Sequence, residues 1–323
     1  MDIKVIIGQL DVTELVQTAT TSGNATIFDR KLNLKITGTI DGRKRALNVE
    51  EGARVLFYVD DVLDFVGVLF AQDIESYGDM NLIAYDTNIY LAKSNDSLII
   101  KNKKASDVIK QIARDYGIEI GQIDDTGYVI PYYKAEGTLR EIILKVLNLT
   151  KRQTGLSYFI GNDKGKLTLK KGAKPSERYV LSAGENLLSV TYHRTIDETK
   201  TQIKVIGGTK GKETIITVKD SDKRVKYGVL QEVEIMDESA TASQVKQRAE
   251  TLLKQKARLM ETLDVEVLGV REVKTGTAVR FFDEMTRAPG DYYVAADTHE
   301  YRAGLHTMSL SLERTYELEY IET

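Results

Sequence analysis

Short alternations of apolar and polar residues fill most of the first 95 positions and restrict this region to extended chain. Residues 31–37 alternate strictly, so that Leu32, Leu34 and Ile36 share one face of a strand. Many short strands with turns every ~8–12 residues are typical of an antiparallel sandwich or barrel. Further β-rich segments lie at 3–7, 52–59, 65–70 and 81–85.

Helical periodicity appears only after this β-rich region. Apolar residues between 105 and 116 form one helical stripe, and Gly117 follows at a position where a left-handed cap favours glycine. A second helix starts at Thr138, which has capping-box spacing with Glu141. We therefore predict helices at about 105–116 and 138–153.

A hairpin at residues 156–170 completes this α+β segment, and β-rich segments return after it. Because the segment interrupts a chain of strands, we interpret it as an inserted domain. The predicted domains are a first β-barrel domain at 1–95, the inserted α+β domain at 96–180, and a second β-barrel domain at 181–323 that is interrupted by a helix at about 241–260.

Two distant segments have similar patterns. Residues 52–57 resemble residues 276–281, and each segment precedes an acidic turn and an aromatic strand. Either the chain carries two copies of one β-domain, or unrelated hairpins resemble one another. The predicted fold class is mainly β with an α+β insert: two similar antiparallel β-barrel domains plus the inserted domain.

Composition excludes several classes of protein. The net charge of -3 argues against a dedicated nucleic-acid-binding protein, which usually carries a basic excess. The absence of cysteine excludes disulfide scaffolds, Cys-ligated zinc, iron–sulfur clusters and Cys nucleophiles. The first residues lack a basic start followed by an apolar run, so we predict no signal peptide. We also predict no membrane span, since no run of about 18 apolar residues occurs.

Two carboxylate pairs are candidates for acid–base chemistry. Asp124 and Asp125 are adjacent, as are Asp60 and Asp61, and both pairs lie among turn residues. Short polar side chains commonly shape turns, and we favour that role for both pairs. Asp283, between Phe282 and Glu284, is loop-like as well. A Ser-based triad is not indicated, because no Gly-x-Ser-x-Gly motif occurs.

Three further features have a functional and a simpler interpretation. His299 and His306 could bind a metal together with Asp297, but they read more readily as polar strand residues. Residues 207–212 resemble a phosphate-binding loop but lack its glycine spacing, so a basic hairpin turn is favoured. The basic face of the helix near 241–260 is interpreted as solvated. We predict no catalytic, cofactor-binding or metal-binding residues.

Several short segments follow one another in an order that resembles one known family. These segments are 49–52, 65–68, 83–86, 90–91, 105–109, 112–113, 124–131, 150, 154–155, 165–169 and 306–308. On this basis the chain is similar to the XkdQ/YqbQ family of contractile-tail hub proteins, relatives of the myophage baseplate hub. The resemblance covers nearly the whole chain, although no single motif is chemically diagnostic.

This resemblance implies a structural protein rather than an enzyme. It implies a homotrimer whose two β-barrel domains per chain form a six-fold-like ring, which adapts a hexameric tail tube to a trimeric central spike. The implied partners are the tail tube protein, the spike, baseplate wedge proteins and a tape-measure protein, with no membrane and with DNA passing only through the lumen. The implied location is the baseplate of a virion, tailocin or other contractile tail particle, made in the bacterial cytoplasm.

Two other functions stay open at this point. One is a cell-wall hydrolase that uses Asp124 and Asp125, and the other is a peptidoglycan-binding module of the tail tip. The absence of tryptophan counts against the second, because sugar sites favour stacking aromatic side chains.

Overall fold

The computed structural model describes residues 1–39, 41–45, 47–172 and 179–314. The chain divides into two compact units, Met1–Thr191 with Leu263–Thr323 (unit 1) and Tyr192–Thr262 (unit 2). Among the described residues, no helix has the length and apolar character that crossing a membrane requires.

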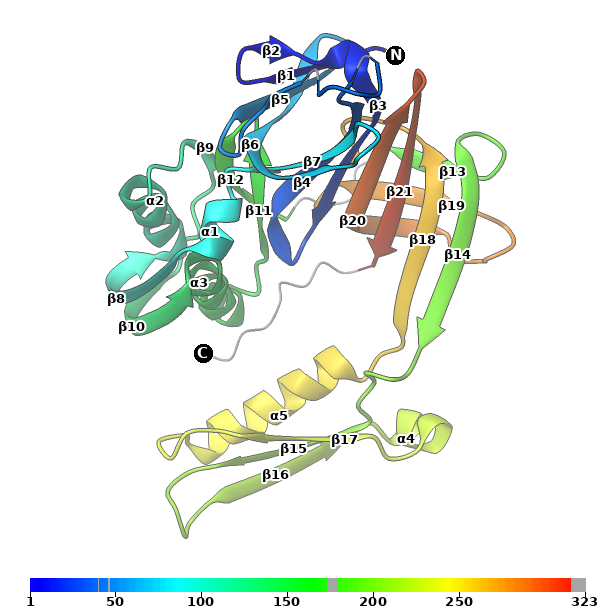
Figure 1. The fold of residues 1–323 in the computed structure, drawn as a ribbon. Coiled ribbons are helices and arrows are strands. Elements are labelled where there is room, and N and C mark those ends of the chain that lie inside the picture. Colours follow the sequence, from blue (N-terminus) through cyan, green and yellow to red (C-terminus); the bar gives the residue numbers. More distant parts are fainter. Residues whose placement is uncertain (40, 46, 173–178, 315–323) are drawn as a thin grey trace. The chain divides into compact units, whose positions relative to one another are not determined.

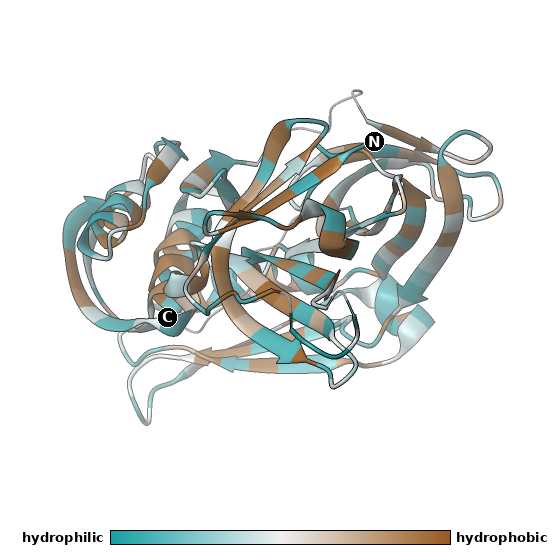
Figure 2. Ribbon diagram, turned by 45° about the horizontal axis from the view of Figure 1, so that its top comes forward, coloured by the Kyte–Doolittle hydropathy of each residue, from teal (hydrophilic) through white to brown (hydrophobic). Residues whose placement is uncertain are grey.

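A large sheet of 13 strands dominates unit 1 (Figure 1). Along its strands hydrophobic and hydrophilic residues alternate (Figure 2), as the sequence pattern predicts for a sheet with one buried face. The strands are β1 (Ile3–Ile7), β2 (Leu10–Asp11), β3 (Val16–Asn24), β4 (Ile27–Thr37), β5 (Arg54–Val59), β6 (Val62–Ile74), β7 (Asp79–Asp86), β13 (Val180–Ser182), β14 (Leu187–Thr195), β18 (Met260–Leu268), β19 (Ala278–Phe282), β20 (Gly290–Arg302) and β21 (Leu305–Glu313), with the short 3-10 helix η1 (Thr13–Leu15) after β2.

The sheet contains the same five-stranded arrangement twice. The strands of the first repeat are ordered β3-β4-β7-β6-β5, and those of the second are ordered β14-β18-β21-β20-β19. The equivalent strands therefore follow one another in the same order both in sequence and in space. This arrangement confirms that the chain carries two similar antiparallel β-domains.

Hydrogen bonds at the start of β5 and β19 fix how the repeats align. Gly52 N donates to Leu69 O at 2.8 Å, and Gly276 N donates to Val294 O at 2.9 Å. Both glycines have positive φ angles, +88° and +86°, which other residues adopt at a cost. The similar segments noticed in the sequence thus occupy equivalent positions.

A β-bulge recurs at the same place in each repeat. The β6–β7 pairing shifts register between Leu69 and Ala71, and the β20–β21 pairing shifts between Val294 and Ala296. An extra residue at a bulge increases the local twist of a sheet. Leu69 and Val294 are therefore equivalent residues, and Asp297 is the equivalent of Gln72.

The two repeats are joined edge to edge. Residues Ala19–Asn24 of β3 pair antiparallel with Ala296–Tyr301 of β20, so that one sheet runs through both (Figure 1). Tyr301 of the second repeat packs in the core of the first, where its ring lies 5.2 Å from that of Phe57. The repeats are therefore fused by a strand pair and a shared core.

The α+β segment follows β7, as predicted. Thr138 and Glu141 form the expected capping box, with Glu141 N donating to Thr138 Oγ1 at 3.1 Å and Thr138 N donating to Glu141 Oε2 at 2.7 Å. Its strands β8 and β10 form a two-stranded ribbon that the sequence analysis did not predict. The elements are α1 (Ile89–Lys93), β8 (Asn95–Lys104), α2 (Ala105–Asp115), β9 (Ile120–Ile123), β10 (Val129–Thr138), α3 (Leu139–Thr154), β11 (Tyr158–Asp163) and β12 (Lys166–Lys171).

Unit 2 corrects the predicted content of the second barrel. Three strands that lie inside the predicted second β-barrel domain (181–323) form a separate sheet in the order β16-β15-β17 instead of joining the large sheet. Their apolar face is covered by a helix of the same unit, through Ile203, Val205 and Val245. The elements are β15 (Gln202–Gly207), β16 (Thr214–Lys219), α4 (Ser221–Tyr227), β17 (Gln231–Ile235) and α5 (Ala242–Lys256).

The place of unit 2 in the chain follows from the repeat. It lies between β14 and β18, whereas their equivalents β3 and β4 are separated only by residues 25–26. The helix predicted near 241–260 is shorter than expected: α5 ends at Lys256, and β18 begins at Met260. Unit 2 is thus an insertion into a tight turn of the second repeat.

Candidate functional site

The first carboxylate pair shapes a hairpin turn. Asp60 and Asp61 connect β5 to β6, with φ angles of +46° and +60°. Asp60 Oδ1 also accepts a hydrogen bond of 2.8 Å from the backbone amide of Asp2. These contacts assign a turn role to the pair, as the sequence analysis favoured.

The second carboxylate pair is held by local hydrogen bonds. Asp124 Oδ2 accepts from the amide of Lys171 at 2.8 Å, and this bond lowers the pKa of Asp124. Asp125 Oδ2 lies 2.7 Å from Lys104 Nζ, which with the amide of Gly127 lowers the pKa of Asp125. A glycosidase needs one carboxyl group with a raised pKa as its general acid. Neither residue has that property.

Asp297, His299 and His306, the trio for which metal binding was considered and polar strand residues were favoured, do come together inside the protein. His299 Nδ1 lies 2.9 Å from His306 Nε2, and His299 Nε2 lies 3.0 Å from Val273 O. A carbonyl oxygen only accepts, so His299 Nε2 carries a proton and donates it to Val273 O. Burial, together with His299, lowers the pKa of His306 to about 4.

Asp297, the third member of the trio, is bound by an arginine from the other repeat. Its side chain is fully buried, and Arg30 Nη1 and Nη2 contact its two oxygens at 2.9 and 2.5 Å. Thr275 donates to Asp297 Oδ1 from both its amide and its hydroxyl, at 2.6 Å each. Although burial opposes ionisation, Arg30 and His299 hold the pKa of Asp297 well below its usual range. Asp297 is therefore the anion of a buried ion pair that joins the repeats.

Metal binding is not favoured at this trio. Both ring nitrogens of His299 already have protein partners, and a metal ligand must offer a free lone pair. Among the residues that the structure describes, no three His, Asp or Glu side chains gather in a way that could hold a metal ion.

Three more ionisable groups, partly or fully buried, lie near this junction. Lys274 Nζ lies 2.7 Å from Asp64 Oδ1, and burial lowers the pKa of Lys274. Asp86, at the end of β7, is 2% exposed and accepts from Asn88 N at 2.9 Å. Burial raises the pKa of Asp86 to about 8, so its carboxyl group is largely protonated at neutral pH.

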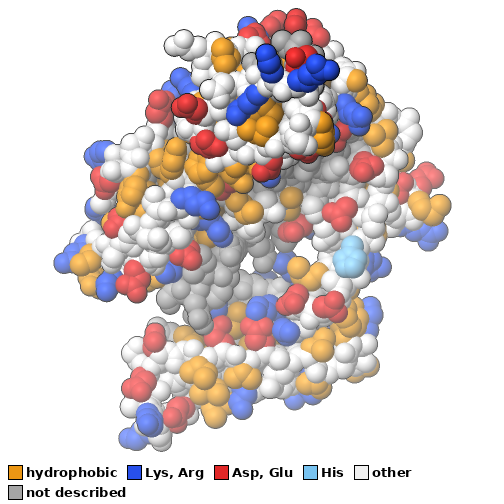
Figure 3. All heavy atoms as spheres, in the orientation of Figure 1, with side chains coloured by type: hydrophobic (Ala, Val, Ile, Leu, Met, Phe, Trp, Pro, Cys, Tyr) orange, Lys and Arg blue, Asp and Glu red, His pale blue; other side chains and the backbone are white. Residues whose placement is uncertain are grey.

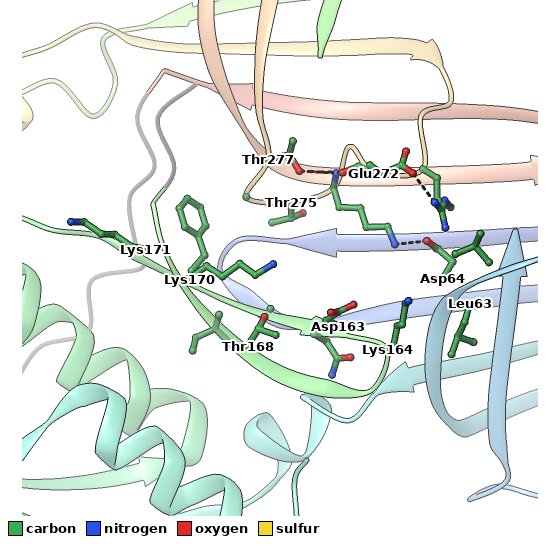
Figure 4. A pocket seen from close by; sticks show the side chains of 18 residues that line it. Leu63, Asp64, Asp163, Lys164, Thr168, Lys170, Lys171, Glu272, Thr275 and Thr277 are labelled. Atoms are coloured by element: carbon green, nitrogen blue, oxygen red, sulfur yellow. Dashed lines mark hydrogen bonds and ion pairs between the residues drawn. The ribbon is translucent and has the colours of Figure 1, made fainter. Parts of the chain in front are cut away.

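A groove of about 570 Å³ lies beside the junction (Figure 4). The hairpin of β11 and β12 forms one wall and contributes Lys164 and Lys170. The segment around Thr275 forms the other wall, with the Asp64–Lys274 ion pair at one end. Charges of both signs line the groove, and no nucleophile paired with a general base is present among these lining residues. The groove therefore has no catalytic constellation.

The remaining candidates are surface features. Residues 207–212 form the turn between β15 and β16, where Gly211 N donates to Glu213 Oε1 at 2.8 Å. On α5, Arg248 and Lys256 pair with Glu234 and Glu232 of β17. The face in Figure 3 carries charged side chains of both signs, interspersed without one continuous basic surface.

The geometry thus defines a β-rich protein made of two fused β-domains with two insertions. A family model described as YQBQ-like matches residues 18–313. The chain belongs to this YQBQ-like family, as the sequence resemblance predicted.

Individual relatives agree with this assignment. The chain is 33% identical over 277 residues to the phage-like element PBSX protein XkdQ of Bacillus subtilis (strain 168), covering 85% of each chain. Its fold is similar to that of the prophage MuSo2 43 kDa tail protein from Shewanella oneidensis, with a TM-score of 0.77, 13% identity, and 97% and 98% of the two chains covered. It is also similar to an E. coli component of the type VI secretion system that is described as structurally similar to T4 bacteriophage tail proteins, with a TM-score of 0.57, 10% identity, and 99% and 79% covered.

Proposed function

We propose that this chain is the baseplate hub of a contractile tail, in a phage, tailocin or related particle. Three copies form a ring with six similar β-domains, which adapts a hexameric tail tube to a trimeric central spike. The other partners are baseplate wedge proteins and a tape-measure protein, and DNA passes only through the lumen. The site of action is the tail particle, after synthesis in the bacterial cytoplasm.

The internal repeat is the observation that carries this proposal. Two β-domains with the same strand order are fused edge to edge by β3 and β20. A ring of three such chains presents six similar positions to a six-fold tube, while the chain itself keeps three-fold symmetry for the spike. The relation to a phage-like element protein and the likeness to tail-protein folds support the same role.

The alternative of a cell-wall hydrolase has less support. Asp124 and Asp125 have lowered pKa values and serve local hydrogen bonds, which does not suit a general acid. The groove between the hairpin and Thr275 offers ion pairs but no activated nucleophile. We therefore propose a structural and non-enzymatic role.

Electron microscopy of assembled particles tests the proposal. A particle carrying an affinity-tagged chain should show the tag at the baseplate, in three copies per ring. Particles made without this chain should lack the spike, because the tube has no adaptor to hold it. Six copies per ring, or two dissimilar domains facing the axis, would contradict the proposal.

A further inference from the structure

The second half of β20 lies between two strands. On one side it pairs with β21, and on the other its residues Ala296–Tyr301 pair with β3 of the first repeat. Asp297, His299 and Tyr301 are buried there. In the second repeat, this stretch therefore has partners along both edges.

Among the strands that the structure describes, the equivalent stretch of β6 has a partner along only one edge. Residues Gly67–Ile74 pair with β7, whereas the pairing with β5 ends at Val68. In the bulge-based alignment, Gln72 corresponds to Asp297 and Ile74 to His299. Ile74 is 47% exposed, while His299 is fully buried. The difference arises because, within residues 1–39, 41–45, 47–172 and 179–314, no strand pairs with β6 as β3 pairs with β20.

The amides along this open edge are directed outward. Glu75 N donates to Asp79 O across the β6–β7 hairpin at 2.9 Å. Successive amides of a strand alternate between its two edges, so those of Ile74 and Gln72 face away from β7. An unpaired row of backbone donors and acceptors is a template for another strand.

A strand with the complementary open edge exists in the second repeat. β14 is the equivalent of β3, and it ends the strand order of the large sheet, with β18 as its neighbour. Leu188 of β14 is 56% exposed. The chain thus carries one joined pair, β3 with β20, and the two unjoined strands that correspond to it, β14 and β6.

We infer that β14 of one copy pairs antiparallel with residues 71–74 of β6 in the next copy, repeating between chains the β3–β20 junction within a chain. This inference rests on the proposed function and names the contact that builds its ring. The interface is head-to-tail, because each copy uses two different edges, and such an interface closes into a ring when its rotation permits. The ring then contains one type of junction throughout.

Disulfide cross-linking in assembled particles tests this pairing. The chain has no cysteine, so every cross-link comes from introduced residues. Asp73→Cys is combined in turn with Leu188→Cys, Ser189→Cys, Val190→Cys and Thr191→Cys, and oxidised particles are separated on non-reducing gels. We expect covalent dimers and trimers when the β14 cysteine lies on the same face of the sheet as the cysteine at position 73. We expect none from the β14 positions next to it in the sequence, whose side chains point to the other face.

Two control pairs show how much disulfide cross-linking a facing pair and a distant pair of cysteines give. Ser22→Cys with Thr298→Cys, a facing pair in the β3–β20 junction, should form a bond within one chain. Asp73→Cys with Thr217→Cys, on the exposed face of β16 in unit 2, should give no covalent oligomer.

The outcomes separate the two proposals. Rings of three copies without cross-links at any β14 position would overturn this inference and leave the hub function standing. Particles in which the chain is absent from the baseplate, or forms no three-copy ring, would overturn the hub function and the inference with it.

Discussion

Replacing Asp297 by alanine is the sharpest test of how the two repeats hold together. The side chain of Asp297 is fully buried and receives hydrogen bonds from Arg30 of β4 and from Thr275. Asp297→Ala leaves the Arg30 guanidinium and the Thr275 amide without this partner. Breaking a buried ion pair by removing one member costs about 3–5 kcal/mol. A loss of this size should lower the melting temperature by on the order of 10 °C.

Urea unfolding at pH 7, followed by circular dichroism, measures this loss. Asp291→Ala is the matched control, because Asp291 pairs with Arg280 on the surface at 37% side-chain exposure. Exposed pairs contribute little, so this variant should stay close to the parent. The double variant Arg30→Met, Asp297→Leu should recover part of the lost stability, since it removes both charges and keeps apolar volume, while the Thr275 amide still lacks its acceptor.

The pH dependence gives an independent check. The pKa of Asp297 is lower in the folded chain than in the unfolded chain, so its contribution is fully present above about pH 4 and is lost as pH falls through the folded value. The difference in free energy of unfolding between the parent and Asp297→Ala should therefore be constant from pH 5 to 8 and become smaller below pH 4. Equal losses in Asp297→Ala and Asp291→Ala would refute the role of the buried ion pair.

Three further predictions concern other parts of the chain. Ile143→Asp should unfold the α+β segment, because Ile143 is fully buried in its core and an unpaired buried charge is costly, whereas Lys145→Asp should not; limited proteolysis distinguishes the two. Asp86 has a raised pKa, so the free energy of unfolding of the parent should fall as pH rises from about 4 to about 8, and Asp86→Asn should remove this loss. If urea unfolding shows the same fall between pH 5 and pH 8 in the parent and in Asp86→Asn, the prediction is wrong. Purified protein should not clear peptidoglycan in a turbidity assay, and clearance that disappears in Asp124→Asn, Asp125→Asn would support the hydrolase instead.

Much of the local structure was predictable from the sequence. Capping chemistry at Thr138 marked the start of α3, and its capping box is present. Strict alternation around Leu32 to Ile36 marked β4, in which Leu32, Leu34 and Ile36 are buried. The prediction that Asp60 and Asp124 shape turns instead of catalysing a reaction also followed from neighbouring residues. These features depend on interactions between residues that are close in the chain, so the sequence alone determined them.

Which strands pair with one another could not be predicted from the sequence. The alternation of β15 showed which of its faces is apolar, but the same pattern fits the edge of any sheet, and the strand belongs to unit 2 instead of the second barrel. The β8–β10 ribbon joins strands that are separated by α2 and β9. Backbone hydrogen bonds between strands carry no side-chain code, and for this reason such pairings were not read from the sequence.

The buried junction was likewise decided by tertiary structure. Arg30 and Asp297 are 267 positions apart, and nothing in either local sequence indicates a partner. His299 and His306 were noticed as a possible pair, but only the packing of β20 against β3 and the segment at Val273 determines which atoms their rings contact. The sequence determined many of the helices and strands and indicated a repeat. The fold decided which edges join, because desolvation of these charges occurs only when both repeats pack together.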